Sequence, residues 1–256
     1  MIDFIKSAQP YTFAIVFLMI YAAEHVFPQR KDLIDTKHDL RNILIGLINL
    51  AVVFFFGIYF QKIIAWAAAK NIGLFHFLQL KGIAAIILQF LVIDIIMYWW
   101  HRFNHTIPFF WQFHKFHHVD TKLNATTALR FHAVELMLSF LFRLLFFVVM
   151  GIGSAAIIIY GIFYLPIIIF HHSNLRISEK ADNLLRTVLV TPGMHRIHHS
   201  VLPFETRSNY SSLLPWWDLV FKTNRKKPVQ EIRFGIDESM LTSEVEGERN
   251  NGIGNR

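Results

Sequence analysis

Histidine is the residue type whose number and spacing in this sequence point most directly to chemistry. The chain has 14 histidines, and three groups of them have helical spacing: HRFNH (101–105), HKFHH (114–118) and HRIHH (195–199). Residues at i, i+3 and i+4 share one face of a helix, so each group can direct two or three imidazoles to one place. Eight imidazoles exceed what a single ion needs. The spacing therefore predicts a site for two metal ions that lie side by side.

Two acidic residues are placed where they could support these imidazoles. Asp94 lies seven residues before His101, which is about two helical turns and nearly the same face. A carboxylate inside an apolar run is costly, and accepting a ring N–H from a metal ligand would compensate it and orient the ring. The alternative for Asp94 is pairing with an arginine or a polar contact between helices. Glu135, three residues after His132, could support a ligand in the same way.

Several other kinds of site are excluded by the residues that are missing. The chain has no cysteine, so disulfides, thiolate zinc sites, iron–sulfur clusters and cysteine nucleophiles are ruled out. Neither the His-Glu-x-x-His motif of zinc hydrolases nor the Gly-x-Ser-x-Gly motif of serine hydrolases occurs. Imidazole is a good ligand for iron, and two irons can together activate dioxygen against an unactivated C–H bond. In a membrane protein that bond would belong to a lipid.

The elements that carry the histidines read as membrane-embedded helices. The sequence is 54% hydrophobic and only 17% charged, with a mean hydropathy of +0.40, whereas soluble domains have about 25% charged residues. Five apolar runs are each long enough to cross a bilayer as a helix. They span residues 11–27, 43–60, 82–100, 134–150 (which contains Glu135 and Arg143) and 153–170. We expect an all-α integral membrane protein with about four to five transmembrane or hairpin helices.

The connections between the runs predict the rest of the architecture. The last two runs are separated only by Gly151 and Ile152, so they form a helical hairpin that crosses and returns, or dips in without fully crossing. Residues 63–69 could extend the second helix, 70–73 read as a stop, and 74–80 could lie at the membrane interface. Residues 1–223 are expected to form one membrane-embedded domain with its histidine core at about 89–223. Residues 224–256 read as a polar, partly disordered tail.

Charge predicts the orientation of the chain in the membrane. The segment between the first two runs must lie on the same side as the segment that follows the third, and both are basic. Positive-inside logic places both on the cytoplasmic side, so the histidine groups would form a cytosolic helical cap. The net charge of +7 suits anionic lipid headgroups. No nucleic-acid partner is expected, because no basic stripe with interleaved aromatic residues stands apart from the apolar runs.

At these histidines the chain resembles the fatty acid hydroxylase and sterol desaturase superfamily, whose signature is His-x-x-x-His, His-x-x-His-His and His-x-x-His-His. The resemblance runs from about Gln89 to Thr223 and is closest to the bacterial sterol-desaturase-like branch, near the alkylglycerol monooxygenases. It includes NATTALRFHAVE (124–135), HHSN (171–174), TPGMHRIHHS (191–200), NY (209–210) and WWDLVFKT (216–223). Ala133, Ser211 and Lys222 depart from the usual residues but leave the histidines intact.

The resemblance implies the set of metal ligands. Eight of them come from the three signature groups, and two further histidines match additional ligands of the superfamily. His171 stands where relatives usually have Gln, and its implied role is to support the ligands or the fold. The ten implied ligands are His101, His105, His114, His117, His118, His132, His172, His195, His198 and His199.

The resemblance also implies a function. The protein would be a non-haem di-iron, dioxygen-dependent oxidoreductase that hydroxylates or desaturates a lipid of sterol, fatty acyl or ether-lipid type. Electrons would come from a separate donor such as a cytochrome b5-like protein, a ferredoxin or a reductase. Zinc could replace the two irons in purified protein. The alternative is a His-rich membrane protein that binds or transports metal without oxygenase activity.

Overall fold

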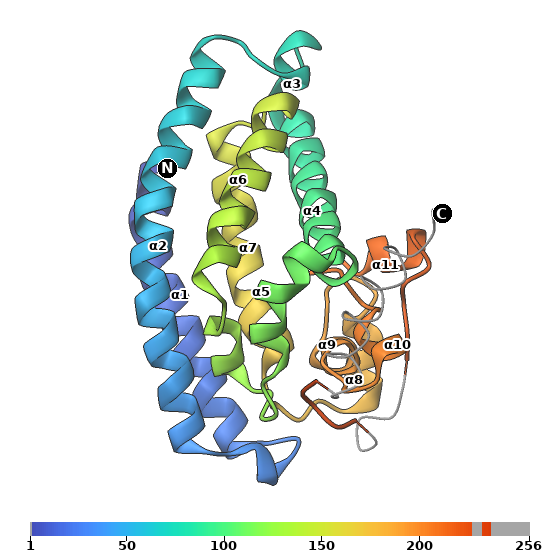
Figure 1. Ribbon diagram of the computed structural model, residues 1–256. Helices are drawn as coiled ribbons and strands as arrows, with labels where there is room; N and C mark the ends of the chain where they lie inside the picture. The colour runs from blue at the N-terminus through green and yellow to red at the C-terminus, as the bar shows by residue number, and fades with distance from the viewer. Residues whose placement is uncertain (1, 227–231, 237–256) are drawn as a thin grey trace, which may run out of the picture.

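The computed structural model describes residues 2–226 and 232–236, and it is a bundle of long helices joined to a group of short helices and loops (Figure 1). Its two β-bridges within these residues are isolated pairs, so the expected all-α class is confirmed. The long helices are α1 (Ile2–Val26), α2 (Thr36–Ala69), α4 (Gly82–Thr106), α6 (Ala133–Met150) and α7 (Ser154–His172). The shorter ones are η1 (Lys31–Leu33), α3 (Leu74–Phe77), α5 (Pro108–His118), η2 (Ala125–Leu129), α8 (Glu179–Leu185), α9 (Pro192–His198), α10 (Pro203–Thr206) and α11 (Trp216–Val220).

Four apolar segments of this bundle are long enough to cross a membrane. The first is Thr36–Phe77, which comprises α2 and α3, and the others are helices α4, α6 and α7. The apolar part of α1, Tyr11–Val26, is shorter. Many large apolar side chains on their outer faces are exposed, including Phe54 and Ile83, which are 70% and 78% accessible. Such a surface is stable in a bilayer and unstable in water. The protein is therefore an integral membrane protein.

Helix boundaries differ from the apolar runs in ways that matter for the histidines. Helix α2 begins at Thr36, because the side chain of Asp35 accepts hydrogen bonds from the first backbone N–H groups, and it continues through the expected extension to Ala69. Helix α4 continues past the apolar run to Thr106. It therefore carries His101 and His105 in its last two turns. Pro108 then ends the helix and starts α5, which turns the chain back toward α4.

The expected hairpin is formed by α6 and α7. Gly151 closes α6 in the left-handed conformation (φ 73°), which glycine adopts without strain, and its N–H returns to Val148 O. Gly73 (φ 108°), after α2, lies directly against this turn. The end of α2 and the tip of the hairpin are thus held together by two glycines in close backbone contact.

Two apolar clusters hold the bundle together. The larger one lies between the long helices and includes Phe60, Ile93, Trp100 and Phe147. The smaller one lies near the short helices and consists of Leu33, Leu123, Ile197, Ile232 and Phe234. Most of the expected tail at 224–256 lies outside the described residues. Its described part at 232–236 packs into the smaller cluster, and Val201 N donates to Arg233 O at 2.8 Å.

We expect Gly73→Ala to destabilise the protein strongly. A Cβ at this position would lie against the backbone of Gly151 and 2.6 Å from Val148 O, and the residue would keep a positive φ. The combined strain and overpacking should cost about 2 kcal/mol or more. Gly57→Ala is the matched control, because a Cβ there meets nothing within 4 Å. Thermal unfolding in detergent should show a lower midpoint for Gly73→Ala alone; equal midpoints would contradict the close approach.

Candidate metal centre

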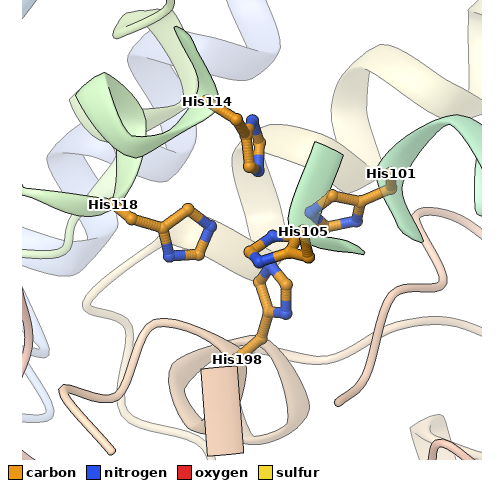
Figure 2. Close-up of side chains that lie close together, drawn as sticks. All are labelled: His101, His105, His114, His118 and His198. Carbon is orange, nitrogen blue, oxygen red and sulfur yellow. The ribbon is translucent and has the colours of Figure 1, made fainter. Parts of the chain in front are cut away.

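Five histidines from three elements converge in a first group. His101 and His105 come from the last turns of α4, His114 and His118 from α5, and His198 from α9. One nitrogen of each ring lies within 4.8 Å of one nitrogen of every other ring. Figure 2 shows the five rings pointing toward one another from these separate segments. Four of the side chains are buried and His101 is partly buried.

Four more histidines, all buried, form a second group beside the first. They are His117 of α5, His172 of α7, His195 in the middle of α9 and His199 at its C-cap. The two groups share ring contacts: His118 stacks on His199 with centroids 4.3 Å apart and an interplanar angle of 13°. Alternate histidines of α5 and α9 thus point to the two groups, and the groups adjoin.

Backbone carbonyls and one carboxylate orient most of these rings from outside. The Nδ1 of His101 lies 2.8 Å from Tyr210 O, and the Nδ1 of His198 lies 2.7 Å from Ser208 O. The Nδ1 of His114 lies 2.7 Å from Glu135 Oε1. Because oxygen atoms of this kind only accept, each Nδ1 carries the proton. The Nε2 atoms are then unprotonated and point inward, as metal ligands do.

The second group tests whether these residues fit a metal. His117 Nδ1 donates to Arg130 O at 3.0 Å and His172 Nδ1 donates to Ile168 O at 2.7 Å, so neither Nε2 carries a proton. Yet these two Nε2 atoms lie 3.0 Å apart. Two lone pairs at this distance repel unless a cation lies between them. Imidazole nitrogens bind zinc at about 2.0–2.1 Å, so two of them at right angles around one ion lie about 3 Å apart.

The first group fits a metal for the same reason. The Nε2 atoms of His105, His114 and His198 are buried and have no hydrogen-bond partner within the described residues. Burying a polar atom without a partner costs roughly 1–3 kcal/mol. Three such atoms aimed at a common point make a costly arrangement that a bound cation would stabilise.

Burial also keeps five histidines of α5 and α9 neutral: His117, His118, His195, His198 and His199. It lowers the pKa of His198 to about 3, and it lowers the pKa of His118 and His199 well below the usual value of 6.5. After burial, the charge that His199 would carry lowers the pKa of His118 further, and the charges that His117 and His172 would carry lower the pKa of His199 further. The pKa values of His117 and His195 are lowered in the same way. Neutral imidazole is the form that binds metal.

A buried polar network holds the carbonyl that orients His117. Arg130 donates from Nε to Phe116 O at 3.0 Å and from Nη1 to Asn42 Oδ1 at 3.1 Å. Asn42 in turn donates to Asp120 Oδ2 at 3.1 Å. The other oxygen of Asp120 accepts from His38 Nε2 at 2.6 Å. The start of α2 is thereby tied to the end of α5, so the second group is positioned by residues far apart in sequence.

The structure brings together nine of the ten histidines that the resemblance implies as ligands. His132 is the tenth, and it lies outside both groups. Its Nδ1 accepts from Val134 N at 3.1 Å as the N-cap of α6, and its ring packs against Phe113. His171 is buried against His195, with ring centroids 4.0 Å apart, and belongs to neither group.

The two expected acidic supports have different outcomes. Glu135 does accept from a histidine, although the histidine is His114 and not its near neighbour in sequence. Asp94 does not support a ring. Seven residues are about 10 Å along a helix, which is farther than its side chain reaches. Its oxygens instead accept from Tyr160 Oη, Trp217 Nε1 and Leu214 N at 2.7, 2.7 and 3.2 Å.

Sequence reasoning missed the carbonyl acceptors and the network around Asp120. Backbone carbonyls have no sequence signal, because every residue has one. Asp120 and His38 are 82 residues apart, and only the fold shows that they meet. A signal did exist in Asn42 and Asp39, two polar residues near the start of an apolar helix that are almost fully buried.

Comparison with known proteins agrees with this histidine-rich site. A family model described as fatty acid hydroxylase matches residues 86–223, more than half of the chain. The chain belongs to the fatty acid hydroxylase family. The matched region contains all nine histidines of the two groups. No solved structure matches this member of the family.

Three curated proteins illustrate its relatives. Alkylglycerol monooxygenase of Danio rerio is 31% identical over 173 residues, which cover 67% of this chain and 37% of that protein. Alkylglycerol monooxygenase of Xenopus tropicalis is 33% identical over 159 residues, covering 61% and 34%. Ornithine lipid hydroxylase OlsE of Rhizobium tropici is 24% identical over 143 residues, covering 56% and 42%. The match to this fatty acid hydroxylase family member thus spans well under half the length of each relative.

We expect Glu135→Gln to weaken metal binding by this fatty acid hydroxylase family member without unfolding it. The amide keeps the shape of the side chain but removes the negative charge from the oxygen that accepts from His114 Nδ1. Weakening such a partner of a metal ligand typically costs 10–100-fold in metal affinity. Glu179→Gln is the matched control at an exposed position. Metal content would be measured by mass spectrometry after dialysis against graded chelator. Identical retention curves for the two variants would show that Glu135 does not support a metal ligand.

Proposed function

We propose that this chain is a membrane-bound, non-haem di-iron oxidoreductase that uses dioxygen to hydroxylate or desaturate a lipid. The observation that carries the proposal is the pair of adjoining imidazole groups, in which unprotonated nitrogens face one another. The groups lie at the ends of the membrane-length helices α4 and α7, within about two turns. Membership of the fatty acid hydroxylase family supports the reaction class. The names of the relatives, alkylglycerol monooxygenase and ornithine lipid hydroxylase, support a lipid as substrate.

The proposed ligands are the nine histidines of the two groups. One ion would be held by His101, His105, His114, His118 and His198, and the other by His117, His172, His195 and His199. His132 is left out of this set because its Nδ1 already caps α6 and its ring lies among phenylalanines. The proposed ligands are all imidazoles and they adjoin the membrane, which suits iron. Zinc could replace iron in purified protein.

Bound iron would supply the redox chemistry that activates dioxygen, which no side chain of this site can supply. Hydroxylation would consume the C–H bond, dioxygen, two electrons and two protons to give an alcohol and one water. Desaturation would consume two C–H bonds with the same electrons and protons, and would give an alkene and two waters. The protein's own share is to hold the ligands in one protonation state and to exclude water by burying them.

The electrons would come from a separate protein. The nine histidines are committed to the two groups, and the chain has no cysteine to bind an iron–sulfur cluster. A cytochrome b5-like protein, a ferredoxin or a reductase could be the donor. We place the site on the cytoplasmic side, because the end of the bundle that carries the metal groups is basic. The connection between α1 and α2, with Arg30 and Lys31, and the first turn of α2, with Lys37, lie at this end.

Two histidine variants test this function and its ligand set. His172→Ala removes a ring that faces both His117 and His195, so iron should be lost from the second group and oxidation should stop. His132→Ala removes only a helix cap and should keep the wild-type iron content, with a stability loss of about 1 kcal/mol. Iron per chain would be measured in purified protein. Lipid products would be measured in a strain that lacks the gene and carries either variant or the wild-type chain.

The possible results separate the functions. An oxygenated or unsaturated lipid that wild-type and His132→Ala restore and His172→Ala does not would support the oxidoreductase. Iron binding with no lipid change in any strain, and no dioxygen consumption, would favour a metal-binding or transport protein. Equal iron content and activity in His172→Ala would contradict the ligand set.

A further inference from the structure

Arg143 is a charged residue in the middle of a membrane-length helix. It is the eleventh residue of the 18-residue helix α6. Leu141 and Leu145, two residues away on either side, are 56% and 61% exposed and form the outer face. Two residues correspond to about 200° of rotation, so Arg143 projects to the opposite, inner face. Glu135, Ser139 and Phe147, at spacings of four on that inner face, are all buried.

Within the described residues, the guanidinium of Arg143 has no counter-ion. Its Nε donates to Ser139 O at 3.1 Å, and its Cζ lies 4.7 Å from the centre of the Phe140 ring. No carboxylate of the described residues lies within ion-pair distance of it. An arginine offers five N–H donors, and one backbone carbonyl uses one of them. A cation at the centre of a span is costly, and such residues usually mark a binding site.

Other polar side chains meet Arg143 at the same depth. Tyr160 and Tyr164 of α7 are close enough to interact electrostatically with its guanidinium, and their rings stack with centroids 5.3 Å apart. Tyr160 also donates to Asp94 of α4. Both Asp94 oxygens are used by Tyr160, Trp217 and Leu214, so Asp94 is not free to pair with Arg143.

This polar layer lies close to the metal groups. Tyr164 is seven residues before His171 on α7, and Arg143 is eight residues after Glu135 on α6, which is about 12 Å along the helix. The side chain of Arg143 turns back toward Ser139 and so toward Glu135 and the first metal group. Helix α6 packs mainly on α2 and α4, and α7 packs on α1 and α4. The contacts of Arg143 with Ser139 of α6 and with the two tyrosines of α7 place its guanidinium between α6 and α7, where Arg143 remains partly accessible.

We propose that Arg143 binds the anionic group, a phosphate or a carboxylate, of a lipid that lies between α6 and α7. A guanidinium holds either group with two parallel hydrogen bonds, and Tyr164 could supply another donor. In one respect the inference rests on the proposed function: the bound lipid is the substrate only if that function holds. A lipid chain held in this way and running from Arg143 toward Glu135 would bring a carbon several bonds from the charged group to the first metal group, which makes Arg143 a specificity-determining residue.

Binding of simple probes tests this proposal without turnover. Purified full-length protein in dodecyl maltoside, a detergent with no charged group, would be titrated with dodecyl phosphate, dodecanoate and dodecanol. Native mass spectrometry would give the bound fraction. We expect both anions to bind about ten- to hundredfold more tightly than the alcohol, as a charge-assisted hydrogen bond predicts. Inorganic phosphate at the same concentration should not displace dodecyl phosphate, because the site takes a lipid and not a free ion.

Three variants assign the preference to Arg143. Arg143→Gln should lower affinity for both anions to that of dodecanol and leave dodecanol unchanged. Arg143→Lys keeps the charge but loses the planar guanidinium that makes two parallel hydrogen bonds, so it should give an intermediate affinity. Arg41→Gln, at an exposed position at the start of α2, is the matched control and should match wild-type. If Arg143→Gln does not fold, the wild-type and Arg143→Lys affinities still decide the question.

Several results would overturn the proposal. They are equal binding of anions and alcohol by wild-type protein, an anion preference that survives in Arg143→Gln, and displacement of the probe by inorganic phosphate. Because no oxidation is measured, failure of the proposed function is separable. If the protein oxidises a lipid but shows no preference for anions, only the proposed role of Arg143 is rejected. If it prefers anions but oxidises no lipid, only the proposed enzymatic function is rejected.

Discussion

Unprotonated imidazole nitrogens that face one another in a buried space repel unless a cation lies between them. His117 and His172 are in this position, because backbone carbonyls take the proton of each outer nitrogen and leave the inner nitrogens 3.0 Å apart. Burial lowers the pKa of His117 well below its usual value, so a proton is a poor substitute for a metal. A cation held at this place would stabilise the arrangement.

Much of the fold serves to hold these imidazoles together despite their repulsion. The break at Pro108 folds α5 back so that its histidines meet those of α4, and Thr191 with Pro192 starts α9 where its three histidines complete both groups. The network from His38 through Asp120 and Asn42 to Arg130 fixes the carbonyl that orients His117. Membrane-length helices carry these groups at their ends, where a lipid and a metal site can meet. Arg143 adds a second polar level deeper in the same bundle.

The parts that could be predicted from sequence are those with a short-range signal. Helical spacing within three five-residue segments predicted eight histidines that the structure brings together in the two groups, because i, i+3 and i+4 positions share a face whatever the rest of the chain does. His172 has no such partner nearby, and only the resemblance suggested it. His132 was implied as a ligand in the same way, but its position at the start of α6 makes it a helix cap.

The remaining contacts depend on distances that the sequence does not contain. Asp94 is on the same face as His101 but two turns away, so depth along the helix decided its partners, and these come from residues 66 to 123 positions later. Arg143 was visible as a charge in an apolar run. That no described carboxylate pairs with it became visible only when α4 and α7 were in place around it.

The most direct measurement is anomalous diffraction at the iron absorption edge from crystals of the purified protein. Two separate peaks are predicted, one among His101, His105, His114, His118 and His198, and one among His117, His172, His195 and His199. A single peak, or iron bound elsewhere with both histidine groups empty, would contradict a two-metal centre built from these rings.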